Sequence, residues 1–476
     1  MRTILDCYTD EPAGLGVPPY LGTYPRYLAG VLGESVCYIT IDDLRRPFKP
    51  SLKTDITTYN KTNNDIQKVV QNTEELIVVA GVHTPGKYLS AVPATLKEIV
   101  GVVKQFRCRK VLTGPAGSVH GSRLEGGKLA ENVSLDVFDV VDENYLGINN
   151  YKKVKDYAIK GAYLAKLHPS FPNLVAEIET ARGCPRSKGC SFCTEPFKGL
   201  EKRDVHDVVS EVVALGDVGV RHFRLGKQSD FFARSAGEIE FMLKGIRDKV
   251  NPITLHIDNV DPVSVDEEKV KLVVKYCSDG NVAAFGVESF DEEVIKQNNL
   301  NSDPEKTMDA IRILNKFGSE KGPNGLPKFL PGINILFGLA GESKKSHVAD
   351  MFWLRKILDE NLLLRRINIR QVVAFPGTPL FEGCKNKFIK KNKRFYWKWR
   401  NDIRQNIDFP LLKRLCPEGT ILKNVMTEIY DGNTTFCRQL GTYPLIVGVK
   451  GRLPLKQFIS VRIKGYMLRS LVGEKV

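Results

Sequence analysis

The sequence predicts an α/β protein of three main parts: an N-terminal Rossmann-like parallel sheet, a central partial (β/α)6 barrel and a small C-terminal β-rich domain. Two observations lead to this fold class. Over most of the chain, apolar β-rich runs alternate with helix-length segments, which is typical of parallel sheets covered by helices. After Pro417 the pattern changes to short β-like runs with turn signals between them.

These patterns divide the chain into five segments. Residues 1–150 form the Rossmann-like domain, with glycine-rich turns after apolar strands, and residues 151–173 are expected to be a basic linker. Residues 174–384 contain six β/α repeats, which predict a partial barrel with its ligands at the carboxyl ends of the strands. Residues 385–417 are predicted to be a basic, aromatic helical segment, and residues 418–476 the β-rich domain.

Composition narrows the function classes. No run of about 18 apolar residues occurs, so no membrane span is expected. The acidic start MRTILDCYTDEP does not resemble a secretory signal, and we expect a cytoplasmic protein in which clustered cysteines serve metal binding or catalysis. The net charge is +15, and residues 385–423 alone carry twelve Lys or Arg against three Asp or Glu. This block favours RNA or another polyanion as a partner, and a solvated basic helix face is the alternative.

The strongest local signal is GCPRSKGCSFC, residues 183–193, which follows the first predicted barrel strand. It contains Cys184, Cys190 and Cys193, one thiol short of the four ligands that a structural zinc site takes. An iron–sulfur cubane held by three thiolates leaves one iron open to a reacting ligand. A zinc site with a distant fourth ligand, or cysteines without any metal, are the alternatives.

The spacing of these cysteines, with the aromatic Phe192 before the third, resembles the signature of the radical S-adenosylmethionine (SAM) superfamily. The common form has three residues between the first two cysteines, whereas this chain has five. The resemblance covers roughly residues 174–382. It implies a [4Fe–4S] cluster on Cys184, Cys190 and Cys193, and reductive cleavage of SAM to methionine and a 5′-deoxyadenosyl radical that abstracts hydrogen from a substrate.

Other barrel motifs resemble the family in the same order. The segment RLGKQSD matches the second-strand segment that meets the SAM amino group, which implies contacts from Gly226, Lys227 and Gln228, although Gly-Gly-Glu is the common form there. In AFGVESFDEE, Glu288 is the candidate for the ribose hydroxyls, assisted by Ser289.

Two further segments complete the predicted barrel mouth. GINILFGLAGES resembles the fifth-strand motif near the adenine, where Gly338 and Gly341 would allow close backbone approach. His256 and Asp258, on LHIDNVDP, are expected to point toward the same mouth, His256 more often as a structural residue than as a substrate contact.

The N-terminal domain resembles the front domains of two radical SAM groups. One is the cobalamin-binding group, but its Asp-x-His-x-x-Gly loop is missing here, so no motif supports cobalamin. The other is the methylthiotransferases, whose front domain holds a second cluster on three cysteines. Cys7, Cys37 and Cys108 precede the barrel, but Val82 stands where the third cysteine is expected, and a second cluster is therefore disfavoured.

The tail, residues 418–476, resembles the TRAM domain, a small β-barrel found in RNA-modifying enzymes. Its stretch RQLGTYPLIVGV also looks like a helix-hairpin-helix turn, and the whole chain resembles an archaeal-type radical SAM group with such a tail. The basic, aromatic run KRFYWKWR suits single-stranded RNA, and its alternative is a helix whose aromatics pack on the barrel.

The sequence therefore predicts a radical SAM enzyme that modifies RNA, expected to be tRNA, with electrons from a donor protein. One alternative is a cobalamin-dependent radical SAM enzyme that acts on a small molecule or a protein. The other is a non-enzymatic RNA-binding protein whose cysteines hold zinc.

Overall fold

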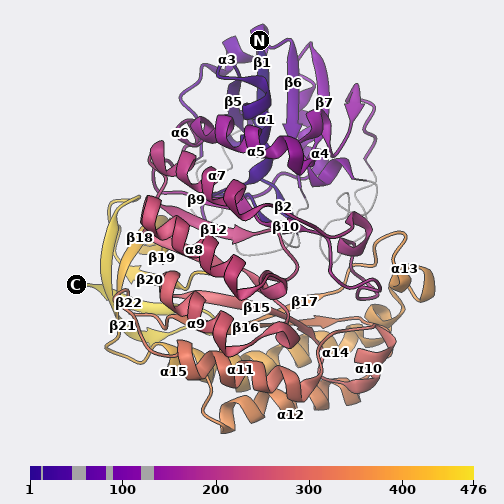
Figure 1. Ribbon diagram of the computed structural model, residues 1–476, viewed down its shortest axis with the longest axis vertical. Helices are drawn as coiled ribbons and strands as arrows, with labels where there is room; N and C mark the ends of the chain where they lie inside the picture. The colour runs from indigo at the N-terminus through magenta and orange to yellow at the C-terminus, as the bar shows by residue number, and fades with distance from the viewer. Residues whose placement is uncertain (12–13, 46–59, 82–88, 119–132) are drawn as a thin grey trace.

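The computed structural model describes residues 1–11, 14–45, 60–81, 89–118 and 133–476 (Figure 1). The N-terminal domain stands at one end, the six-stranded barrel and its helices fill the middle, and the small β-barrel lies beside them. The predicted fold class, an α/β chain with two parallel sheet systems and a β-rich tail, is confirmed.

The N-terminal sheet is parallel, with strand order β5-β1-β6-β7-β8. The order reverses between β1 and β6, which makes the carboxyl ends of these two strands the topological switch point of an open α/β sheet. Its strands and helices are β1 (Arg2–Asp6), β5 (Cys37–Thr40), β6 (Glu75–Val79), β7 (Arg109–Thr113), β8 (Val140–Val141), α1 (Thr23–Leu32), α2 (Ile41–Leu44), α3 (Ile66–Asn72) and α4 (Leu96–Val103), with the ribbon β2 (Asp10–Glu11) and β3 (Gly14–Leu15).

The predicted linker, residues 151–173, is helical over much of its length. It contains α5 (Tyr151–Lys160) and α6 (Leu164–Leu167), and α5 packs against α1. A Cβ at Gly30 would come within 2.0 Å of the Tyr157 carbonyl oxygen, so the two helices touch backbone to backbone. The segment is a packed layer between the two sheets, and the sequence missed it because its basic residues face outward.

Six parallel strand positions form the partial barrel, in two sheets with the orders β13-β12-β9-β4 and β14-β15-β16-β17. The edge strand β4 (Tyr20–Leu21) comes from the N-terminal segment and pairs with β9 in parallel. The other elements are β9 (Val175–Glu179), β12 (His222–Gly226), β13 (Thr254–Ile257), β14 (Asn259–Val260), β15 (Asn281–Glu288), β16 (Phe329–Phe337), β17 (Arg366–Gln371), α7 (Val205–Asp217), α8 (Ala236–Val250), α9 (Glu267–Tyr276), α10 (Glu292–Gln297), α11 (Pro304–Gly318) and α12 (Lys344–Asp359).

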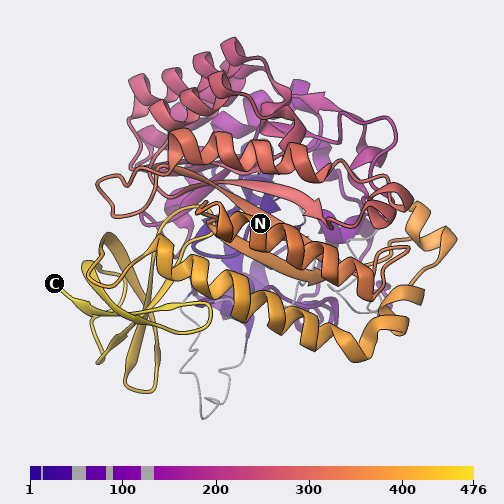
Figure 2. The ribbon, with the colours of Figure 1, turned by 90° about the horizontal axis from the view of Figure 1, so that it is seen from below.

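A helical rod follows the barrel and ends at the small β-barrel (Figure 2). It consists of α14 (Lys387–Ile403), the π-helix η7 (Arg404–Asp408) and α15 (Phe409–Leu415), preceded by α13 (Pro379–Gly383). The Arg404 guanidinium donates to the Ile367 carbonyl (2.6 Å), and the Ile367 amide donates to Asp408 Oδ1 (3.3 Å). The rod therefore covers the free edge of β17, which would otherwise expose unpaired backbone groups.

The tail is a closed barrel with strand order β18-β19-β20-β22-β21, the strand number of the OB-fold barrels. Its strands are β18 (Ile421–Asp431), β19 (Thr434–Gln439), β20 (Ile446–Lys450), β21 (Phe458–Tyr466) and β22 (Leu471–Lys475). The helix-hairpin-helix alternative is wrong, because RQLGTYPLIVGV forms the end of β19, a loop and β20. β-branched residues in both flanks favour strands, and Gly441 and Pro444 lie in the turn between them.

Among the described residues, no helix is both long and apolar enough to cross a membrane.

Candidate functional site

The cysteine loop is a closed excursion from the end of the first barrel strand. The short strand β10 (Ala181–Arg182) pairs with β11 (Glu201–Lys202) in antiparallel fashion, so the two ends of residues 183–200 are tied together. Gly183 has φ +77°, and a Cβ there would lie 1.6 Å from the Gly199 carbonyl oxygen. Only glycine fits this crossing, which fixes the base of the loop at the carboxyl end of β9.

The far side of the loop is held by the turn after α10. Ser191 Oγ and Asn298 Oδ1 are 2.7 Å apart, and the Ser191 amide donates to the Asn298 carbonyl at 2.9 Å. Asn299 Nδ2 donates to the Gly189 carbonyl at 3.0 Å, and the Arg186 guanidinium donates to the Asn299 carbonyl at 2.7 Å. These bonds hold the loop across the carboxyl ends of the barrel strands, where barrel enzymes place their chemistry.

The three thiols share this loop and influence one another. Burial raises the pKa of Cys190 to about 11 and that of Cys193 to about 12, and the charge of Cys184 adds to both shifts. The Arg186 guanidinium donates to Cys190 Sγ at 3.4 Å. Phe192, the predicted aromatic, packs with Cys190 in a small apolar cluster. Burial thus favours the protonated forms of Cys190 and Cys193, and metal binding must displace their protons.

The donor set fits an iron–sulfur cluster by its chemistry. The described residues contain no group of three or more His, Cys, Asp or Glu side chains placed to hold one metal ion. The thiolates of a cubane bind different iron atoms, so their sulfurs need not converge on a single point. Cys184, Cys190 and Cys193 would hold the cluster, on a loop whose apolar wall is formed by Phe192 and its neighbours.

The predicted contacts to the SAM amino group lie at the end of β12, beside the cysteine loop. Gly226 ends the strand, and Lys227 follows in the left-handed region with φ +63°. The Lys227 side chain turns to the N-terminal segment, with Nζ 3.9 Å from the Tyr24 ring centroid and 4.0 Å from Glu179 Oε1. Gln228 is buried and bonds to Thr180 Oγ1 at 3.1 Å. The side chains of Lys227 and Gln228 are therefore both engaged within the protein.

The predicted ribose contact, Glu288, ends β15 with φ +64°. Burial raises the pKa of its carboxyl to about 8, despite the nearby positive charge of Arg370. Among the described residues it makes no hydrogen bond or ion pair, and its charge would act on Cys190. Ser289 instead donates to Asp350 Oδ1 at 3.2 Å, away from the barrel mouth. The structure thus brings Glu288, but not the Ser289 hydroxyl, to the cysteine loop.

The two predicted adenine-side glycines approach other parts of the protein closely. Gly338 has φ +99°, and a Cβ there would lie 2.3 Å from Ile389 Cγ1 of α14. A Cβ at Gly341 would lie 2.9 Å from Gln297 Oε1. The Gly338 amide donates to Glu342 Oε2 at 2.6 Å, and Asn392 Nδ2 of α14 donates to Glu342 Oε1 at 2.7 Å. This motif therefore also anchors the basic helix to the barrel mouth.

The sequence missed a buried charge network in the barrel lumen. The Arg224 guanidinium on β12 bonds to Glu177 Oε2 of β9 at 2.6 Å and also to Asp258, and all three residues are almost fully buried. The Tyr443 hydroxyl from the tail donates to Asp258 Oδ1 at 2.8 Å. Period-two alternation along the strands is the signal that could have placed Glu177 and Arg224 inward.

Tyr443 belongs to the β19–β20 loop, residues 440–444, which docks on the amino-terminal ends of the barrel strands. The Thr442 amide donates to His256 Nδ1 at 2.9 Å, and Thr254 Oγ1 donates to the Leu440 carbonyl at 3.1 Å. Arg365 donates to the Tyr443 carbonyl at 2.7 Å. The expectation that His256 points to the cysteine side is therefore wrong: it is a structural residue at the opposite end.

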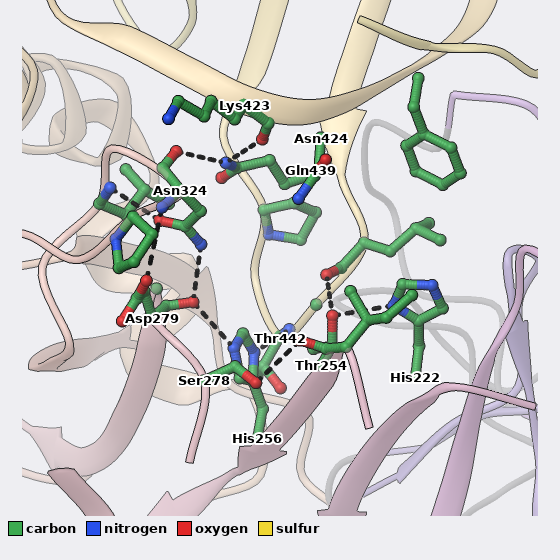
Figure 3. A pocket seen from close by; sticks show the side chains of 18 of the residues that line it. His222, Thr254, His256, Ser278, Asp279, Asn324, Lys423, Asn424, Gln439 and Thr442 are labelled. Carbon is green, nitrogen blue, oxygen red and sulfur yellow. Dashed lines mark hydrogen bonds between the residues drawn. The ribbon is translucent and has the colours of Figure 1, made fainter. Parts of the chain in front are cut away.

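A cleft of about 660 Å³ lies beside this docked loop, between the barrel and the tail. Figure 3 shows His222, Thr254 and His256 on one wall and Lys423 and Gln439 on the other. The cleft is at the amino-terminal ends of the strands, opposite the cysteine loop, because β12 and β13 begin at its rim. It is therefore separate from the candidate cofactor site.

His256 gives the protein a defined pH dependence. Its Nδ1 accepts the Thr442 amide proton, so Nε2 carries the proton and donates to the Asp279 carbonyl at 3.1 Å. Burial lowers its pKa to about 3, whereas the unfolded chain takes up that proton below its ordinary value of 6.5. Stability from this group is therefore lost as the pH falls below about 6.5.

When the pH is lowered from 8 to 5, we expect the free energy of unfolding of the wild type to fall by about 2 kcal/mol more than that of the His256→Gln variant, because only the wild type has this histidine to protonate on unfolding. The comparison needs urea unfolding of both proteins at several pH values, because buried carboxyls contribute equally to both. Parallel profiles for the two proteins would show that His256 is protonated in the folded state.

A polar network joins the carboxyl end of β1 to β5 and α2, beside the switch point of the N-terminal sheet. Tyr8 donates to Asp42 Oδ2 at 2.8 Å, and Tyr38 donates to Asp6 Oδ2 at 2.9 Å. Burial raises the pKa of Asp6 to about 6. Residues 82–88 and 119–132, which include Val82, lie outside the described residues, so cobalamin binding stays a prediction without a motif. Cys7 is buried, and Cys37 and Cys108 are half-buried.

Comparison with known proteins agrees with this geometry. The family model of the radical SAM superfamily matches residues 178–349. An uncharacterized protein of Methanocaldococcus jannaschii is 43% identical, over 99% of this chain and 93% of its own. An uncharacterized protein of Archaeoglobus fulgidus is 39% identical, over 99% of this chain and 89% of its own.

Among solved structures, the radical S-adenosylmethionine methyltransferase TsrM of Kitasatospora setae covers 83% of this chain and 78% of its own, with 12% identity and a TM-score of 0.48. The match of the family model falls on the segment that carries the cysteine loop and the first five barrel strands. The chain therefore belongs to the radical SAM superfamily, which implies a [4Fe–4S] cluster and SAM as its cofactors.

Proposed function

We propose that the protein is a radical SAM enzyme that modifies RNA, with tRNA as the expected substrate. When bound, the cluster and SAM supply reductive cleavage of SAM to methionine and a 5′-deoxyadenosyl radical, with one electron from a donor protein. The observation that carries the enzyme proposal is the three-cysteine loop held across the carboxyl ends of the barrel strands. The remaining residues of this chain orient the cofactor and the substrate there.

The support for RNA lies outside the barrel. Helix α14 carries the basic run and leaves Trp397 exposed, and the tail is a five-stranded barrel of the kind that binds oligonucleotides in many proteins. Both elements contact the barrel directly: α14 through Asn392 and Glu342, and the tail through Tyr443 and Asp258. A nucleic acid bound on α14 and the tail would lie next to the barrel lumen. We propose that the reaction takes place in the cytoplasm.

The proposal predicts that one assay yields two products, 5′-deoxyadenosine and a modified nucleoside in the RNA. After anaerobic reconstitution with iron and sulfide, dithionite and SAM should yield 5′-deoxyadenosine, and tRNA should increase its rate of formation. Mass spectrometry of the digested RNA should then show a changed nucleoside. A full cluster without 5′-deoxyadenosine would refute the enzyme proposal, whereas 5′-deoxyadenosine with no effect of any RNA would refute only the RNA substrate.

A further inference from the structure

Two arginines line the lumen side of the edge strand β17. Along this strand, Ile367 and Ile369 are buried against the helices, so Arg366, Asn368 and Arg370 face the other way. Asn368 Nδ2 donates to Asn334 Oδ1 on β16 at 3.1 Å, which fixes that orientation. The Arg366 guanidinium lies 3.9 Å from the Tyr443 ring centroid, while Arg370 is exposed.

Three more arginines from other parts of the chain join this strand. Arg400 and Arg404 come from the helical rod, and Arg469 comes from the β21–β22 loop of the tail. Burial and the charges of neighbouring arginines lower the pKa of Arg366, and the same two causes lower that of Arg469 to about 10. Arg366 thus lies within electrostatic range of Arg370 and Arg404, and Arg469 within range of Arg366, Arg400 and Arg404; these five residues are the arginine cluster.

Few acidic groups compensate the arginine cluster. Asp408 pairs with Arg404, Asp258 is already bonded to Arg224 and Tyr443, and Glu288 is the acid near Arg370. Within the part of the chain that the structure describes, the side chains of Arg370 and Arg469 make no ion pair or hydrogen bond. Unpaired like charges are costly to keep together, so their retention favours an anionic ligand between them.

A stripe on α14 leads to the arginine cluster. Lys393, Trp397 and Arg400 follow one another at spacings of four and three residues, which places them on one helix face, and the buried Arg404 follows one turn later in η7. Trp397 is 68% exposed, and the Arg400 guanidinium lies 5.4 Å from its ring centroid. Trp399, by contrast, is buried against the barrel, so the exposed Trp397 is not needed for packing.

We propose that single-stranded RNA runs along this stripe, stacks a base on Trp397 and places a backbone phosphate in the arginine cluster at the lateral edge of the barrel. The inference rests on the proposed RNA substrate and adds the path by which it reaches the lumen. Guanidinium groups suit this role, because their planar donors match phosphate oxygens in pairs. Stacking on Trp397 accepts any base, as a path along the chain requires.

Binding of a fluorescent single-stranded RNA to the full chain, measured at several salt concentrations, tests the path. Arg370→Gln and Arg469→Gln should each weaken binding and reduce the slope of log affinity against log salt by about 0.7. Trp397→Ala should weaken binding about tenfold with the slope unchanged, since stacking releases no counterions. Arg107→Gln, an exposed arginine in the N-terminal domain, is the matched control and should bind as the wild type does.

A second measurement separates a folding defect from a lost contact. Because the cluster is self-repelling, Arg469→Gln should melt at the same temperature as the wild type or higher, while RNA raises its melting temperature less. Wild-type affinity and slope in both arginine variants would overturn the path but leave RNA as substrate. Equal affinity for duplex RNA would also overturn it, and no binding of any RNA by the wild type would refute the RNA substrate itself.

Discussion

Cys190→Ala should abolish both the iron–sulfur cluster and the formation of 5′-deoxyadenosine. Cys190 lies in the middle of the loop, where its sulfur accepts from Arg186 and its side chain packs with Phe192. With two thiolates left, the loop has too few ligands to hold a cubane. After anaerobic reconstitution, we expect iron content and visible absorbance near background, and no product above a no-enzyme control.

Cys108→Ala is the matched control, because Cys108 is a half-buried cysteine at the start of β7, outside the barrel. It should keep the full iron content and wild-type product. Circular dichroism should be the same for both variants, since the base of the loop is held by backbone pairing rather than by the thiols. Cluster retention in Cys190→Ala would remove this residue from the ligand set.

Arg224→Ala has the largest expected effect on stability, a loss of about 3–5 kcal/mol in free energy of unfolding. Arg224 is the common partner of Glu177 and Asp258, and all three lie out of contact with water. Its removal takes the guanidinium away from two buried carboxylates and leaves only the charge of Lys227 near Glu177, which is the costly way to break a buried ion pair. Urea unfolding of the wild type and the variant measures the loss.

The comparison for this variant is Arg312→Ala. Arg312 pairs with Glu360 on the surface at 2.7 Å, and such exposed pairs contribute about 1 kcal/mol or less. If Arg224→Ala lowered the free energy of unfolding by no more than Arg312→Ala does, the carboxylates of Glu177 and Asp258 would have to be accessible to water. Restoring the balance with Glu177→Gln in the Arg224→Ala background should recover part of the loss, because one of the stranded charges is then gone.

Local patterns allowed much of the architecture to be predicted. Six barrel strands, the cysteine loop after the first and the change to a β-rich tail after Pro417 all follow from short-range periodicity and spacing. Two alternatives were predicted for the aromatic helix. Trp399 packs on the barrel, as the packing alternative expects, whereas Trp397 faces solvent and RNA binding stays a prediction.

What the sequence did not reveal are contacts between distant segments. Tyr20 and Leu21 look like part of a turn-rich stretch, yet they pair with β9, more than 150 positions later in the chain. Tyr443 lies in a Gly- and Pro-containing turn, and nothing local indicates that its hydroxyl reaches Asp258. Contacts between distant segments leave no periodic pattern in the sequence. In the sequence, Glu177 and Arg224 look like ordinary charged residues on strands, and only the structure shows that they pair in the barrel lumen.

The barrel domain depends on two segments outside it, the edge strand β4 from the N-terminal segment and the docked loop 440–444 from the tail, and it is therefore not expected to fold correctly without them. A fragment of residues 174–384 alone would lack β4, so the edge of β9 would be unpaired. It would also lack Tyr443, so Asp258 would lose the hydrogen bond from the tyrosine hydroxyl. This fragment should aggregate when it is expressed alone, because an unpaired strand edge can pair with other chains. A transplant of the barrel domain onto another scaffold must therefore include residues 20–21 and 440–444 as well.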